Sequence, residues 1–159
     1  MRKTELDEIK RHVRAEDSRF LASRSPFYHT VRMLARYYAR MNAVLKPSGI
    51  DMARWRVLSL LAEREPITVS EIAEDCVAHI STMAKTITRM VSEGLVTVRT
   101  SSADARSTEV MITPEGLALL EQTREKTKHV FKEALRGLTK TEVQLLNSLS
   151  ARIFENLSP

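Results

Sequence analysis

The chain has 159 residues, a net charge of +5, a pI near 9.6 and 43% hydrophobic residues, which fits one globular domain with a modest core. No apolar run reaches the roughly 20 residues that a membrane-spanning helix needs. The first residues lack the apolar core of a signal peptide, and the single Cys76 excludes an internal disulfide. We therefore expect a soluble cytoplasmic protein.

The positive charge is concentrated at one end of the chain. Residues 1–40 hold ten of the basic and five of the acidic residues, whereas residues 41–159 hold fifteen of each. A basic chain suits a polyanionic partner. Because the excess lies in the first quarter, a nucleic-acid site must be argued from local placement of charge.

The first quarter predicts two helices. Apolar residues at roughly helical spacing among charges predict an amphipathic helix over about 4–22, within an N-terminal arm of residues 1–25. Ser25 and Pro26 are typical of an N-cap and a first helical position. The helix that follows extends to about residue 46 and has an apolar stripe of heptad-like spacing, which favours packing on another helix.

Three shorter helices are expected next. Asp51 can cap a helix over about 52–63. Thr68 and Glu71 form a capping-box pattern that opens a short helix over about 69–75. After a brief turn at 76–79, a helix of residues 80–92 ends just before a glycine suited to a left-handed position.

The period then changes to two. Residues 95–99 and 108–113 predict strands, joined by a polar turn at 100–107. A helix capped at Thr113 is expected to reach about residue 136, and a capping box at Thr139 opens the last one. The fold class is mainly α with a small two- to three-stranded β-wing, as a winged helix-turn-helix with N- and C-terminal dimerisation helices.

Residues 80–92 have the two faces that a groove-binding helix needs. Such a helix carries short polar side chains and cations on one face, because base edges and phosphates lie there. The residues predicted to contact DNA are Ser81, Thr82, Lys85, Thr86 and Arg89. The residues predicted to face the core are Ile80, Met83, Ile87, Met90 and Val91.

In this order and spacing the motifs resemble the MarR (multiple antibiotic resistance regulator) family. The matching segments are DMARWRVLSLL, ITVSEIAE, STMAKTITRMVSEGLV and DARSTEVMITPEG, and the match spans about 30–157. The resemblance implies a homodimeric, ligand-responsive transcription regulator, predicted to be a repressor, on a pseudo-palindromic operator. Helix 80–92 would enter the major groove, and the wing at 100–107 would reach the minor groove.

The resemblance also assigns the regions of the chain and the wing residues. Residues 51–113 would form the DNA-binding region, and residues 26–50 and 114–159 the dimerisation region. Arg106 would enter the minor groove, with Asp104 holding it in place. The turn 76–79 departs from the usual family pattern, with Cys76 and His79 where Leu and Ser are common, and so does Ala105 in the wing.

Family members commonly bind small, often anionic aromatic ligands beside the long first helix. Basic residues along one side of that helix suit a carboxylate or phosphate, and nearby aromatic residues could form walls. This implies a small aromatic or anionic effector, with candidate contacts at His29, Arg32, Arg36, Arg40, Tyr37, Tyr38 and Trp55. The competing interpretation is a solvated basic face.

Two alternatives to a ligand-responsive repressor remain open from the sequence. One is a thiol-redox sensor acting through Cys76. The competing interpretation of Cys76 is a small buried residue with a structural role. The other is a winged-helix protein-interaction module without DNA binding. The sequence does not predict an enzyme, a cofactor or a metal site, because the four histidines are scattered and no phosphate-binding loop or nucleophile elbow is present.

Overall fold

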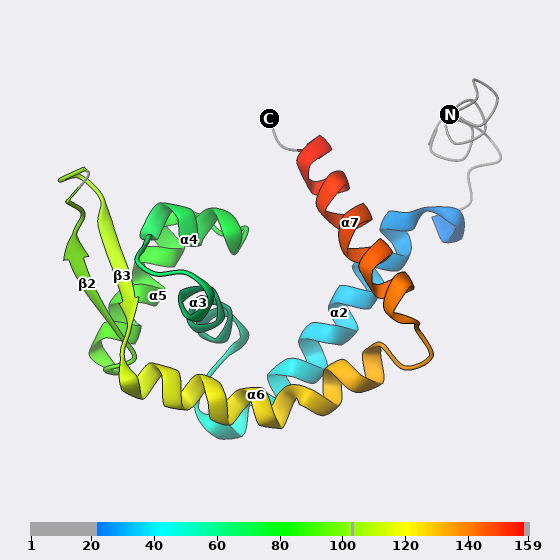
Figure 1. The fold of residues 1–159 in the computed structure, drawn as a ribbon, viewed down its shortest axis with the longest axis horizontal. Coiled ribbons are helices and arrows are strands. Elements are labelled where there is room, and N and C mark those ends of the chain that lie inside the picture. Colours follow the sequence, from blue (N-terminus) through cyan, green and yellow to red (C-terminus); the bar gives the residue numbers. More distant parts are fainter. Residues whose placement is uncertain (1–21, 103, 158–159) are drawn as a thin grey trace.

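The computed structural model describes residues 22–102 and 104–157. The predicted helix over 4–22 therefore lies almost entirely outside the described residues. The fold is mainly helical with one small sheet, as predicted (Figure 1). The long helix α6 joins a compact unit containing the sheet, α3, α4 and α5 to a helical region formed with α2 and α7.

The first helical segment follows the sequence signals closely. After η1 (Ala22–Arg24), α2 (Pro26–Leu45) begins at the predicted proline, but the Ser25 side chain makes no capping hydrogen bond. The short η2 (Lys46–Ser48) then ends at Gly49, whose φ of 72° is left-handed. α3 (Met52–Glu63) is capped as predicted, because Asp51 Oδ1 accepts the Arg54 N–H at 2.9 Å.

The helix-turn-helix itself is α4 (Val69–Asp75) and α5 (Ile80–Ser92). The predicted capping box is confirmed: the Glu71 N–H donates to Thr68 Oγ1 at 3.3 Å, and the Thr68 N–H donates to Glu71 Oε2 at 2.8 Å. After α5, Gly94 takes a φ of 72° and turns the chain into the wing.

The wing belongs to a three-stranded antiparallel sheet in the order β1–β3–β2. Its strands are β1 (Ile67–Thr68), β2 (Val96–Thr100) and β3 (Thr108–Ile112). Val98 pairs with Val110 in the hairpin, and Ile67 pairs with the same residue from the other side. β1 has two residues, too few to show the alternation by which strands are recognised in a sequence.

The last two helices are α6 (Pro114–Ala134) and α7 (Lys140–Leu157). The Thr113 hydroxyl accepts the Gly116 N–H at 3.0 Å and caps α6. Gly116 lies so close to Leu95, the residue before β2, that a Cβ there would stand 2.1 Å from the Leu95 carbonyl oxygen, which explains a glycine at this position. The capping box of Thr139 and Glu142 opens α7 as predicted.

The core lies between α3, α4, α5, the sheet and the inner faces of α2 and α6. By contrast, no residue of α7 is buried. Large apolar side chains along α2 and α7 are open to solvent; the most exposed are Phe27, Val31, Met33, Leu145, Phe154 and Leu157. The core therefore joins the winged unit to the inner faces of α2 and α6, whereas α2 and α7 also display apolar side chains that the described residues leave uncovered.

Candidate nucleic-acid interface

One side of α5 packs against the core and holds the helix in place. Met83, Ile87 and Met90 are buried against the core, as predicted from their spacing. The prediction was wrong for Ile80 and Val91, which are 56% and 39% exposed. Both lie in the end turns of the helix, where it extends past the edge of the core.

The opposite side of α5 carries exposed polar and basic side chains. Ser81, Lys85 and Arg89 follow one another at steps of four residues and are all exposed, so they share one face. Thr88 is also exposed on this face, which its spacing from Lys85 could have indicated, but its hydroxyl donates to the Ala84 carbonyl oxygen at 2.9 Å and so has its proton engaged within the helix.

Thr82 and Thr86 flank that face. Thr82 is exposed, whereas Thr86 is half-buried and its hydroxyl donates to the Thr82 carbonyl oxygen at 3.1 Å. A threonine hydroxyl that donates its proton to a carbonyl of its own helix cannot donate the same proton to DNA. Thr86 is therefore the predicted DNA contact that this arrangement favours least.

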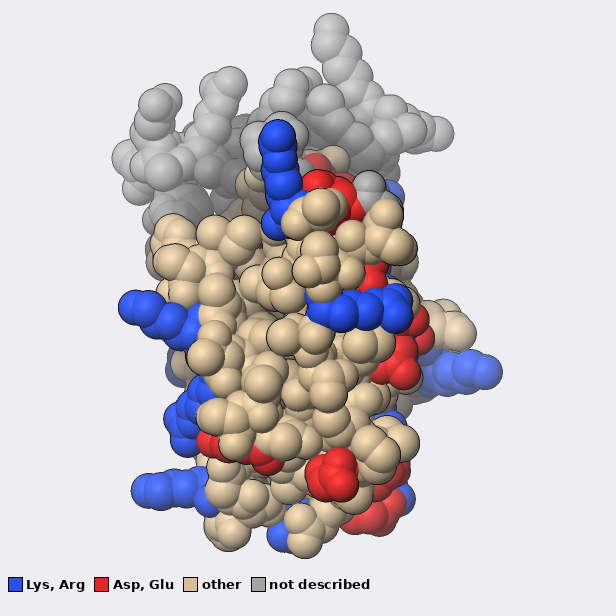
Figure 2. Space-filling view, turned by 90° about the vertical axis from the view of Figure 1, so that its left-hand side faces the viewer, with Lys and Arg blue, Asp and Glu red and all other residues tan. Residues whose placement is uncertain are grey.

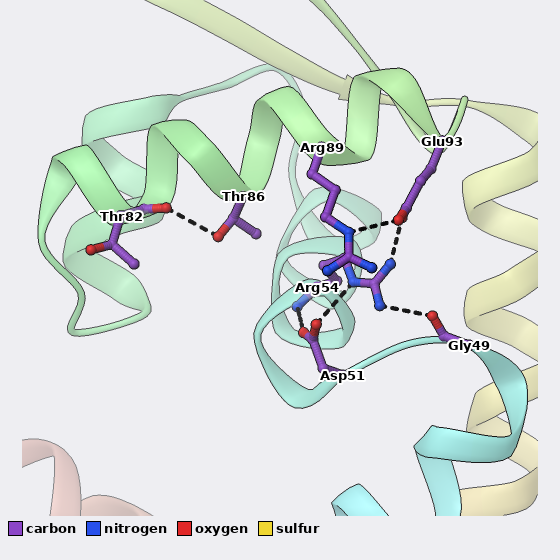
Figure 3. A network of polar contacts seen from close by, with 7 residues as sticks. All are labelled: Gly49, Asp51, Arg54, Thr82, Thr86, Arg89 and Glu93. Carbon is purple, nitrogen blue, oxygen red and sulfur yellow. Dashed lines mark hydrogen bonds and ion pairs between the residues drawn. The ribbon is translucent and has the colours of Figure 1, made fainter.

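Arg89 takes part in a polar network at the C-terminal end of α5 (Figure 3). Its Nε donates to Glu93 Oε1 at 2.8 Å. The other carboxylate oxygen of Glu93 accepts from Arg54 Nη1 at 2.5 Å. Partial burial opposes ionisation of Glu93, but the hydrogen bonds from both arginines outweigh it and lower its pKa below the usual value.

Arg54 is the centre of that network and is only 5% exposed. Besides Glu93, its guanidinium donates to Asp51 Oδ2 at 3.1 Å and to the Gly49 carbonyl oxygen at 2.7 Å. It thus ties the turn between α2 and α3 to the end of the candidate recognition helix. The sequence did not single out Arg54, because its partner Glu93 lies 39 residues away.

The wing tip is shaped by Asp104. Its carboxylate accepts the backbone N–H of Arg106 at 2.9 Å and the Ser107 hydroxyl at 3.0 Å. These bonds fix the turn that carries Arg106, whose side chain is exposed. At the base of the wing, Arg99 pairs with Glu109 at 2.8 Å.

The charges of the winged unit are mostly compensated internally. Arg54, Arg64, Arg89 and Arg99 each form an ion pair. Among the described residues, Lys85 and Arg106 form none. Figure 2 shows the wing-side face, where uncharged residues dominate the centre, Lys and Arg side chains lie mostly toward the margins, and acidic side chains lie among them on the lower part.

The candidate effector residues fall into two groups along α2. Near its start, His29 Nε2 lies 2.7 Å from the Ser23 carbonyl oxygen, and Arg32 donates to the Tyr28 hydroxyl at 2.8 Å and lies over the ring of that tyrosine. Arg40 follows His29 by eleven residues, about 16 Å along a helix. One small aromatic carboxylate therefore does not contact both ends of the predicted set.

The second group is an aromatic cluster between α2, α3 and α6. The ring of Phe131 lies 5.9 Å from Tyr37 and 6.4 Å from Trp55, and Tyr38 lies 5.7 Å from Tyr37. Trp55 Nε1 is buried and has no hydrogen-bond partner among the described residues. Phe131 was missed by the sequence analysis, because only the packing of α6 brings it here.

The two arginines of the predicted effector set on this part of α2 have different surroundings. Arg40 is paired with Glu133 of α6. Arg36 is exposed on α2, and the structure gives it no contact with the cluster. Desolvation, reinforced by Tyr38, raises the pKa of the Tyr37 hydroxyl above its ordinary value, so this group stays protonated near neutral pH.

Cys76 is buried and unpaired, 7% exposed, in the turn between α4 and α5. Burial raises the pKa of its thiol, which lowers the thiolate fraction. The structure thus favours a packing role for Cys76 over a redox sensor. Among residues 22–102 and 104–157, no cluster of potential metal ligands occurs and no helix is long and apolar enough to span a membrane.

Known proteins resemble this chain in sequence and in fold. The model of the MarR family matches residues 50–108. The HTH-type transcriptional repressor IacR of Pseudomonas putida is 39% identical over 132 residues, which cover 83% of this chain and 79% of IacR. This relative shares most of its length with the chain.

Two solved structures share the fold. A MarR-family transcriptional regulator from Silicibacter pomeroyi superposes with a TM-score of 0.79, at 20% identity over 87% of this chain and 93% of that one. CouR from Rhodococcus jostii RHA1, bound to p-coumaroyl-CoA, gives a TM-score of 0.76, at 19% identity over 84% and 94% of the two chains. At these identities the match concerns the fold.

Proposed function

The chain belongs to the MarR family of transcription regulators, and from this we propose that it is a ligand-responsive repressor that binds duplex DNA as a homodimer. The observation that carries the proposal is the geometry of α5 and the wing. An anchored helix presents Ser81, Lys85 and Arg89 on one face, and a hairpin whose turn is held by Asp104 presents Arg106 at its tip.

The proposed contacts divide by chemistry. Lys85, Arg89 and Arg106 supply positive charge to phosphates or to the minor groove. Ser81 and Thr82, in the first turn of α5, suit base edges or a phosphate, because the N-terminal end of such a helix points into the major groove. Thr86 and Asp104 act through the local structure, the first on the helix and the second on the wing turn.

Dimerisation is proposed to use the helices outside the winged unit. Residues 26–50 and 114–159 form this region, and the exposed apolar faces of α2 and α7 are the surface that a second copy would cover. A two-fold dimer presents two recognition helices to two half-sites about 10 base pairs apart.

The proposed effector is a small aromatic carboxylate or its thioester. Tyr37, Tyr38 and Trp55 offer aromatic walls, and Arg36 offers an exposed cation on the same helix. The ligand bound to CouR, an aromatic acyl thioester, belongs to this class. Release of DNA requires that the effector bind the DNA-incompetent state more tightly, since equal affinity shifts no population.

On this proposal the protein acts in the cytoplasm and catalyses no reaction. The test is selection from a random pool of duplexes, followed by titration of the enriched sequence in dilute salt. We expect a two-fold symmetric consensus with half-sites one helical turn apart. A purified dimer that enriches no sequence and binds no duplex refutes the proposal.

The effector part is tested separately by calorimetry with a panel of aromatic carboxylates and their coenzyme A thioesters. A compound that binds should also dissociate the selected duplex. Substitution Arg36→Ala should weaken its binding, whereas Arg124→Ala, seven residues before Phe131 on α6 and paired locally with Glu121, should not. A panel without any binder contradicts this part and leaves DNA binding intact.

A further inference from the structure

The recognition helix begins with an aliphatic residue that the fold leaves open. Ile80 is the first residue of α5, and 56% of its surface is exposed. Along its own helix, the next residues toward the same side are Met83, which is buried, and Ala84, which is small and exposed. The core thus takes up Met83 and leaves more than half of Ile80 in solvent, where that part of a large branched side chain gains nothing from burial.

Ile80 lies at the end of α5 that would approach DNA. In a helix-turn-helix, the N-terminal residues of the second helix contact base edges in the major groove. Ile80 lies directly before Ser81 and Thr82, two exposed residues of the proposed DNA contact. As the first residue of α5, Ile80 lies at the end of the helix that would enter the groove, with more than half of its surface open.

The major groove offers one apolar group to such a side chain. Guanine, cytosine and adenine present donors and acceptors there, whereas thymine also presents its C5-methyl group. We propose that Ile80 is a specificity-determining residue that packs against a thymine C5-methyl group in each half-site. This inference rests on the proposed DNA-binding function and adds to it a base preference.

Val77, although 77% exposed, is not assigned this role. It lies in the turn before α5 and lines a surface hollow with Glu74, His79 and Thr82. A carboxylate beside it disfavours close approach of a phosphate backbone. The aliphatic contact is thus assigned to Ile80, at the helix end, and not to the turn.

The experiment uses the full-length protein and the duplex that it selects from a random pool. Each thymine is replaced in turn by deoxyuridine, which removes one methyl group and nothing else. Burial of one methyl group predicts a loss of about fourfold in affinity at the contacted position. The substitution Ile80→Ser should weaken binding of the unmodified duplex, and deoxyuridine at the contacted position should then cause no further loss of affinity. Ile80→Val should still bind thymine more tightly than deoxyuridine at that position.

A matched control is Val91→Ser, since Val91 is also an exposed aliphatic residue of α5 but lies at its other end. It should discriminate thymine from deoxyuridine as the wild type does, and urea unfolding should give all variants the wild-type midpoint. If no deoxyuridine weakens the wild type, or if Ile80→Ser still discriminates, the inference is wrong while DNA binding stands. If the wild type selects no duplex, the proposed function fails together with it.

Discussion

Arg54 is expected to contribute strongly to stability, although it lies in a charged network. Its side chain is 6% exposed and bonds Asp51, Glu93 and the Gly49 carbonyl. Removing one partner of a buried ion pair costs about 3–5 kcal/mol, because the remaining charge loses its compensation. In Arg54→Ala, Glu93 keeps Arg89 and the half-exposed Asp51 can be hydrated. We therefore expect a loss at the lower end, about 3 kcal/mol.

The matched control is Arg64→Ala. Arg64 also pairs with an aspartate, Asp75, but its side chain is 57% exposed and that of its partner 36%. Such a pair contributes less than about 1 kcal/mol. Urea unfolding of both variants and the wild type, at one protein concentration because a dimer is expected, gives the comparison. Equal losses in the two variants, or a loss below 1 kcal/mol in Arg54→Ala, would refute the role assigned to burial.

Three further predictions concern the same fold. Val77 has a φ of 50°, a left-handed conformation that costs a branched residue about 1–2 kcal/mol. Val77→Gly should therefore raise the free energy of unfolding by about 1 kcal/mol, once the greater conformational entropy of glycine in the unfolded chain is subtracted. An unchanged midpoint in urea would contradict this prediction. Gly116→Ala should lower the free energy of unfolding by about 3 kcal/mol, because the new Cβ meets the Leu95 carbonyl. A variant of wild-type stability would show that Gly116 and Leu95 lie further apart than this. The folded-state pKa of Glu93 is lowered, so its stabilising contribution is complete above the unfolded-state pKa and is lost as the pH falls through the folded-state value. Glu93→Gln should accordingly lose less stability than the wild type as the pH falls below the ordinary glutamate pKa of 4.5, and parallel pH profiles would exclude this contribution.

Local signals determined how well the elements could be predicted. Asp51, Thr68, Thr113 and Thr139 each cap a helix in the structure, and the helices begin where these residues place them. Capping uses backbone groups within three residues, so its signal is contained in a short stretch of sequence. The strand β1 could not be placed in this way, since its two residues are defined by pairing with β3.

The site could be predicted only in part, for the same reason. The exposed face of α5 follows from helical spacing, and Ser81, Lys85 and Arg89 lie on it. Pairing of Arg89 through Glu93 with Arg54 joins segments far apart in the chain, which spacing does not indicate. Exposure of Ile80 depends on where the core ends, and this is set by how α5 packs.

The central claim, that α5 and the wing bind duplex DNA, is tested most directly by the salt dependence of binding. Fluorescence anisotropy with the selected duplex should give a linear fall of log affinity with log salt. Loss of one phosphate contact in each protomer by Lys85→Ala, or by Arg106→Ala, should make the slope shallower by about two units per dimer. Lys128→Ala, which removes an exposed lysine of α6 paired with Glu125, should leave the slope unchanged. Slopes that stay at the wild-type value in both Lys85→Ala and Arg106→Ala would contradict the claim.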